Sequence, residues 1–431
     1  MPRIVLPNGL VVLLAEDHNA PVVSMQLRYR TGTRDDPPAR SGLAGLVPRL
    51  MMQATKHVGK GDYQRMLDAA GSYASGWTVG MDRTMINVSV PSERIALPLW
   101  LLSDQMGFLV ERLDSEMLDE QVKSLLNAHT QTIDNAPAGR VPGLVISALY
   151  PAGHPYHRGS FDISPALTSI SPDDVRAFVE AHYRPEQAIL SIVGDFDSVR
   201  ALALVNKYFA PIGKSGDAAH VSGDVPSLDH EVRMVVAARV ELPSVTIAWP
   251  TAPSQAPDDA PLDLLASALA GPRAGLLRWK LVDELKIAAS VDARQASREF
   301  GSEFWIQVTA TRGHGPRELV SAVDAVLGRL QTAPPNDYVT QGAMTGYLMG
   351  PLFAVERSSA RADRFAECEE YGVQGSCITH WLARYTSVTA ADLSAVAARE
   401  LPLSKRVVAE GYPSAEAPIA GELRDSPPAG Q

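Results

Sequence analysis

Short stretches in which apolar and polar residues alternate occur in both halves of the chain, and a period of two is typical of β-strands. Between these stretches, apolar residues recur at intervals of three and four, which is typical of helices that bury one face. The alternation predicts strands over residues 5–14, 22–29, 85–90, 244–249 and 304–309. The helical spacing predicts helices over residues 43–52, 63–70, 263–269 and 318–330, and further long helices between residues 95 and 129.

Two similar helix starts suggest an internal repeat. Ser171 precedes Pro172 and is followed three residues later by Asp174, while Thr389 is followed three residues later by Asp392. A Ser or Thr hydroxyl caps the first turn of a helix, and an acid there lies close to the positive helix end. A strand-like run follows each helix. Because the two copies lie about half a chain apart, we expect two similar domains and not a solenoid.

The pattern of elements indicates an α+β fold with two homologous domains, each an antiparallel sheet covered on one face by helices. We expect an N-terminal domain over residues 1–213 and a C-terminal domain over residues 228–413. The linker between them, residues 214–227, is rich in Gly, Ser and Asp and has no apolar period. Residues 414–431 are rich in Pro, Ala and Glu, which favours a flexible tail.

Composition narrows the classes of protein to which the chain can belong. The 431 residues are 45% hydrophobic and 20% charged, as in soluble globular proteins, and the net charge is −10. This charge argues against nucleic acid as a main partner, because phosphate binding needs a basic face. No apolar run reaches the roughly 18 residues of a membrane span. No secretory signal is recognisable at the start, and we leave bacterial cytoplasm and periplasm both open.

The two cysteines, Cys368 and Cys377, are too few for a metal cluster. Two free and partly buried thiols are the simpler interpretation. A disulfide between them is the alternative if the chain works in an oxidising compartment.

Several short motifs occur in an order that points to a known family. They are Leu6-Pro7-Asn8-Gly9-Leu10, Gly32-Thr33-Arg34-Asp35 and, further on, Tyr183-Arg184-Pro185. This order resembles the pitrilysin and mitochondrial-processing-peptidase family of zinc peptidases, the inverzincins. The resemblance covers nearly the whole chain. It implies a helix with an H-x-x-E-H motif, in which two His bind zinc and the Glu activates water. It also implies a third ligand, a Glu, on a later helix.

The resemblance places four changed residues at the positions that bind zinc and activate water. Gly45, Pro48 and Arg49 stand where His, Glu and His are expected, and Asn127 stands at the position of the later Glu. Glycine has no side chain, proline has no ligand atom, arginine is a permanent cation, and an amide is a poor zinc ligand. We therefore expect no catalytic residue, no metal site and no cofactor in this chain, with zinc held by a partner subunit.

The stretch Ser75-Gly76-Trp77-Thr78 resembles the region in which the family has a substrate-pairing edge strand. A free edge can bind an extended peptide by adding a strand to the sheet, so Ser75, Trp77 and Thr78 are candidate peptide-binding residues. The simpler interpretation, which the sequence favours, is an ordinary turn and edge in which Trp77 packs at the rim.

Together, these observations predict a non-catalytic, zinc-less subunit of a heterodimeric pitrilysin-type peptidase. The resemblance implies that the two domains form one half of a clamshell, which a zinc-bearing homologous subunit completes around a peptide or unfolded polypeptide. The alternative is a structural or assembly protein of the same fold with no role in peptide cleavage.

Overall fold

The computed structural model describes residues 2–159, 163–214, 221–272, 275–373 and 375–427. Packing divides the chain into two compact units, and both draw on the two halves of the sequence. The first unit contains Met1–Asn127, Asp162–Val221 and Leu352–Ile378; the second contains Ala128–Phe161, Ser222–Pro351 and Thr379–Gln431. The two compact units are discontinuous in sequence, whereas the ranges 1–213 and 228–413 describe the expected sequence repeat. These ranges stay a prediction. Residues 215–220 of the expected linker lie outside the described residues.

The first unit is built on a six-stranded sheet in the order β1-β2-β6-β3-β5-β4. Parallel pairing joins β2 to β6, and antiparallel pairing joins the other neighbours. Its strands are β1 (Arg3–Val5), β2 (Val11–Glu16), β3 (Val22–Tyr29), β4 (Ala74–Val79), β5 (Thr84–Pro91) and β6 (Ala188–Gly194).

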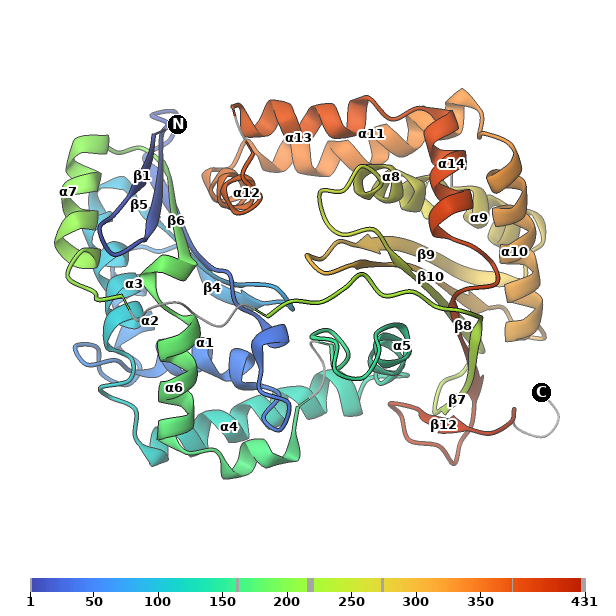
Figure 1. The fold of residues 1–431 in the computed structure, drawn as a ribbon, viewed down its shortest axis with the longest axis horizontal. Helices are drawn as coiled ribbons and strands as arrows, with labels where there is room; N and C mark the ends of the chain where they lie inside the picture. The colour runs from blue at the N-terminus through green and yellow to red at the C-terminus, as the bar shows by residue number, and fades with distance from the viewer. Residues whose placement is uncertain (1, 160–162, 215–220, 273–274, 374, 428–431) are drawn as a thin grey trace. The chain divides into compact units, whose positions relative to one another are not determined.

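The second unit repeats this design in the order β12-β7-β11-β8-β10-β9, with β7 and β11 as its parallel pair. Its strands are β7 (Val232–Ala238), β8 (Ser244–Thr251), β9 (Ala288–Ala296), β10 (Ser302–Ala310), β11 (Val407–Pro413) and β12 (Glu422–Arg424). Figure 1 labels several strands of each sheet. β12 lies within the segment expected to be a flexible tail and pairs with β7.

These sheets confirm the α+β class and the two similar domains, but correct two details. The sheets are mixed and not purely antiparallel, because the strand that follows each capped helix returns parallel to the first long strand of its sheet. The strand expected over residues 5–14 is a hairpin of β1 and β2. Gly9 turns this hairpin at a φ of 92°, where a Cβ atom would come within 2.8 Å of Glu186.

Helices surround both sheets. In chain order they are α1 (Leu43–Gln53), α2 (Asp62–Ala69), α3 (Ala96–Phe108), α4 (Ser115–His129), α5 (Val141–Leu149), α6 (Pro172–His182), α7 (Ser198–Phe209), α8 (Asp259–Ala270), α9 (Leu276–Arg278), α10 (Pro316–Thr332), α11 (Asp337–Ala354), α12 (Ser358–Glu370), α13 (Cys377–Thr386) and α14 (Ala390–Glu400). Within the described residues, no helix combines the length and the apolar content that a membrane crossing needs.

The two capped helices occupy equivalent places. Ser171 caps α6 and Thr389 caps α14, and each hydroxyl accepts a hydrogen bond from the amide of the aspartate three residues later. α6 leads into β6 and α14 into β11, which are equivalent strands of the two sheets. The local capping signal in the sequence therefore located both helix starts correctly.

Alternation along β3 separates two faces of the first sheet. Val23, Met25, Leu27 and Tyr29 face a large apolar core, which they share with α1, α3, α6 and α7. Polar residues occupy the positions between them, yet these are buried as well. The reason is α12, in orange in Figure 1, which packs on β3 and β6. A helix from the second half of the sequence thus covers the polar face of the first sheet.

The exchange of helices is reciprocal. α5, from the first half of the sequence, packs on β8 and β11 of the second sheet. Directly after α5, the hydroxyl of Tyr150 donates a hydrogen bond of 2.6 Å to the buried carboxylate of Glu303 in β10.

Cys368 and Cys377 form a disulfide that joins the end of α12 to the start of α13. Both residues are buried. The preferred interpretation of two free thiols is therefore wrong. The sequence left this open because two cysteines do not by themselves indicate whether their Cβ atoms face each other.

Candidate functional site

The helix expected to carry the zinc motif is intact. α1 runs without interruption through Pro48 and buries Leu46, Val47 and Leu50. Its first turn is capped from upstream, because the carboxylate of Asp36 accepts hydrogen bonds of 2.7 Å from the amides of Gly42 and Ala44. The scaffold of the site is thus present even though the motif is not.

The three changed positions of α1 point in two directions. Pro48 lies in the buried face with the core residues, whereas Gly45 and Arg49 are only half-buried. Gly45 and Arg49 are four residues apart, so they share one side of the helix. This is the side on which paired imidazoles would have to meet a metal.

That side of α1 faces α4. A Cβ atom built on Gly45 would lie 3.7 Å from a methyl carbon of Leu125, and Nη1 of Arg49 donates a hydrogen bond of 3.3 Å to the hydroxyl of Ser124. Burial lowers the pKa of Arg49, and no carboxylate among the described residues pairs with it. Asn127 is exposed at the end of α4. The structure therefore brings α1 and α4 together as the resemblance implied.

The residue types at this place do not fit a zinc ion. A leucine methyl, a guanidinium and a backbone-only glycine supply no electron-pair donor of the kind that zinc takes. Glu120, one acid on α4, forms an ion pair with Lys60. Over the described parts of the chain, no group of three or more His, Cys, Asp and Glu side chains is arranged to hold a metal.

The candidate peptide-binding residues lie on an edge strand. Among the described residues, β4 stands at the end of the strand order and pairs with β5, so its other side has no strand partner there, and it contacts α1. Trp77 is 38% exposed, Ser75 and Thr78 are exposed, and the hydroxyl of Ser75 donates to Gln64 at 3.4 Å. The prediction that these residues bind a peptide remains a prediction.

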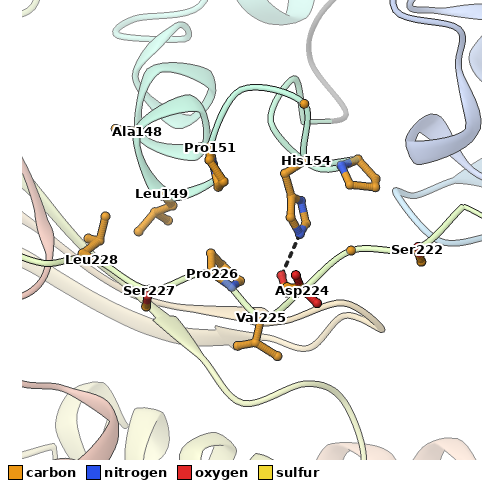
Figure 2. A pocket seen from close by; sticks show the side chains of 13 residues that line it. Ala148, Leu149, Pro151, His154, Ser222, Asp224, Val225, Pro226, Ser227 and Leu228 are labelled. Atoms are coloured by element: carbon orange, nitrogen blue, oxygen red, sulfur yellow. Dashed lines mark hydrogen bonds between the residues drawn. The ribbon is translucent and has the colours of Figure 1, made fainter.

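A cavity of about 500 Å³ lies in the second unit, between residues 148–155 and residues 222–228. Figure 2 shows His154 reaching toward Asp224 across it. Nδ1 of His154 accepts from the amide of Tyr156, so Nε2 carries the proton that it donates to the Asp224 carbonyl, both at 3.0 Å. Burial lowers the pKa of His154. With both ring nitrogens occupied by backbone groups, this histidine has a structural role.

Sequence reasoning missed one polar cluster altogether. Asp263 on α8 accepts hydrogen bonds of 2.8 Å from the hydroxyls of Tyr347 on α11 and Tyr385 on α13. Burial, aided by the nearby charge of Asp259, raises the pKa of Asp263 to about 7. The three residues come from helices far apart in the sequence, so no motif spacing could have revealed them.

Two sequence models of known families match the chain. The model described as insulinase (peptidase family M16) matches residues 11–155, and the model described as the peptidase M16 inactive domain matches residues 169–345. The chain belongs to the M16 peptidase family. The match to the inactive-domain model begins after α1 and α4, so it does not bear on their residues.

Relatives extend over nearly the full length. The zinc protease PqqE of Helicobacter pylori is 22% identical over 403 residues, which cover 91% of this chain and 88% of that protein. A protease from Helicobacter pylori superposes with a TM-score of 0.89 at 20% identity, covering 96% of this chain and 99% of that one. A peptidase M16 inactive domain from Pseudomonas fluorescens gives 0.85 at 16% identity, covering 96% and 98%. At these identities the two solved structures show a shared fold.

Proposed function

We propose that this chain is a non-catalytic subunit of a heterodimeric M16 metallopeptidase, and that it completes a peptide-enclosing chamber around a zinc-bearing homologous partner. One observation carries the proposal. α1 and α4 are preserved and packed together, while Gly45, Arg49 and Leu125 fill the place between them with groups that cannot bind zinc. The family scaffold is kept without its chemistry.

A retained scaffold is useful if enclosure matters. Excluding water and selecting substrates by length need a closed shell, whereas cleavage needs only one zinc ion. A subunit that supplies half of the shell can therefore lose its own metal ligands without loss of function. We expect the two subunits to bury roughly 1,600 Å² or more of total surface, as stable protein interfaces do.

The free edge of β4 supports a role in peptide handling. An extended peptide would add a strand beside β4 through backbone hydrogen bonds, and the half-exposed ring of Trp77 would contact its side chains. Peptide binding at β4 would be an additional property of the proposed subunit, and it is tested separately from heterodimer formation.

Co-expression with a homologue that carries H-x-x-E-H tests the subunit role. We expect the two chains to co-elute, zinc to be present once per pair, and peptide cleavage to need both. Metal analysis of this chain alone should find no stoichiometric zinc. A zinc-bearing chain that is fully active alone and never co-elutes would refute the proposal. Co-elution without any effect on cleavage would instead favour a structural or assembly role.

Two sets of variants refine the test. The triple variant Gly45→His/Pro48→Glu/Arg49→His should remain inactive alone, because the third ligand position still carries Asn127, whose amide is a poor zinc ligand, and Leu125 supplies no ligand atom. Trp77→Ala should weaken peptide binding by the pair without breaking it apart. Val199→Ala, which truncates an exposed apolar residue on α7, is its matched control. Equal peptide affinity in both variants would exclude a contribution of Trp77 to peptide binding while leaving the subunit role intact.

A further inference from the structure

A second cavity, of about 550 Å³, lies entirely within the second unit and is not part of the site described above. It is lined by α9 and the turn that follows it, by α10, and by the segment that leads into α11. Figure 1 shows α9 and α10, which contact each other. Cavities of this size commonly hold small organic ligands.

The floor of the cavity is apolar. Leu330 of α10 and Val339 of α11 are buried there, and Val326, one turn before Leu330, is half-buried. Trp279 lies at the cavity with 59% of its surface exposed. Exposing so much of an indole ring to water forgoes the free energy of its burial, and tryptophan is enriched where proteins bind partners. An apolar ligand would cover this surface.

The charged residues that line the cavity, Lys280 and Arg329, are both cations. Lys280 is paired with Glu284, whereas no acid among the described residues pairs with Arg329. The indole N–H of Trp279 likewise has no hydrogen-bond acceptor in the described part of the chain. Arg329, an exposed residue of α10, therefore presents a cation with no acidic partner among the described residues beside an apolar cavity.

We propose that this cavity binds a small monocarboxylic acid with an apolar or aromatic body. The body would lie on Leu330 and Val339 and cover Trp279, and the carboxylate would pair with the guanidinium of Arg329, a group well suited to carboxylates. We expect a small-molecule carboxylic acid and not a segment of a protein, since the cavity has the volume of a small molecule. The site lies in one unit, so it does not depend on the partner subunit proposed above.

Calorimetry on the full chain with two matched probes, 4-phenylbutyrate and 4-phenylbutanol, tests this proposal. The probes share the apolar body and differ in charge. We expect the acid to bind about tenfold more tightly than the alcohol, which is the size of effect that one charge-assisted hydrogen bond supplies. Equal binding of the two probes, or no binding of the acid, would overturn the proposal.

Variants identify the residues involved. Arg329→Gln should weaken binding of the acid about tenfold and abolish its preference over the alcohol, whereas Arg329→Lys should retain much of that preference. Trp279→Ala should weaken both probes alike. Arg200→Gln, which removes the same charge from an exposed position on α7, is the matched control and should change neither. The assignment of the carboxylate to Arg329 is wrong if the Arg329→Gln variant has the same unfolding midpoint as the native protein and still binds the acid more tightly than the alcohol.

Discussion

Arg28 of β3 and Glu370 of α12 form a buried ion pair, with Nη1 and Oε2 2.8 Å apart, across 342 positions of sequence. The two side chains are 2% and 8% exposed. Arg28 also donates to Asp363, and Glu370 also pairs with Arg83. The contact ties a helix from the second half of the sequence to the polar face of the first sheet.

Removing the charge of Glu370 should therefore destabilise the protein strongly. In Glu370→Gln, the buried cation of Arg28 and the half-buried cation of Arg83 lose this carboxylate, and we expect a loss of about 3 kcal/mol in the free energy of unfolding. Glu369→Gln is the matched control, because its partner Arg3 is 52% exposed and such pairs contribute below about 1 kcal/mol. Urea denaturation of both variants measures the difference. Equal losses would show that the buried pair has no special role.

Reducing the disulfide at the end of α12 should lower the stability of the protein. Cys368 and Cys377 are nine positions apart, and closing a loop of this length restricts the unfolded chain by about 2–3 kcal/mol. We expect the double variant Cys368→Ser/Cys377→Ser to lose about this much stability and to become insensitive to reductant. The native protein should lose a similar amount in reductant, once alkylation followed by mass spectrometry shows both thiols to be free. An unchanged free energy of unfolding after complete reduction of the native protein would contradict this prediction.

The carboxyl of Asp263 predicts a specific pH dependence. Its pKa is raised from an ordinary 3.8 to about 7, first because of burial and then because of the charge of Asp259. Between about pH 4 and pH 7 the folded state therefore holds a proton that the unfolded state has released, so this group's contribution to stability falls as pH rises and is constant above about pH 7.

Asp263→Asn should remove that fall, since the amide still accepts hydrogen bonds from Tyr347 and Tyr385 but does not titrate. Free energies of unfolding measured from pH 4.5 to pH 8 check it, with Asp337→Asn at an exposed position as the control for loss of a carboxylate. Parallel pH profiles for Asp263→Asn and the native protein would refute the assignment.

Arg49 should be replaceable with a gain in stability. Its half-buried guanidinium has the hydroxyl of Ser124 as its hydrogen-bond partner, and burial disfavours its charge. We expect Arg49→Leu to stabilise the protein by up to about 1 kcal/mol, measured by chemical denaturation. Arg112→Leu, at an exposed position before α4, should bring no such gain. A loss of stability in Arg49→Leu would show that Arg49 holds α1 and α4 together.

Signals that depend on sequence neighbours were sufficient for much of the fold. The capping residues Ser171 and Thr389 begin α6 and α14, and the alternation along residues 22–29 marks β3 with its observed bounds. The resemblance, and not the spacing, proposed Gly45 and Arg49 as former zinc-ligand positions, and helical spacing then puts these two residues on one side of α1. The resemblance, not the spacing, indicated that α4 would lie opposite them.

Contacts between distant segments were decided only by the tertiary structure. From its alternation, β3 has an apolar face and a polar face, and a polar face is ordinarily left to water. Here Ser24, Gln26 and Arg28 are buried because Ser358, Asp363 and Glu370 of α12 supply their hydrogen bonds. The parallel pairing of β2 with β6 and the disulfide depend in the same way on where segments meet in space. The sequence by itself determines which faces are polar, because that follows from neighbouring residues, whereas whether water or a helix satisfies them depends on packing across the whole chain.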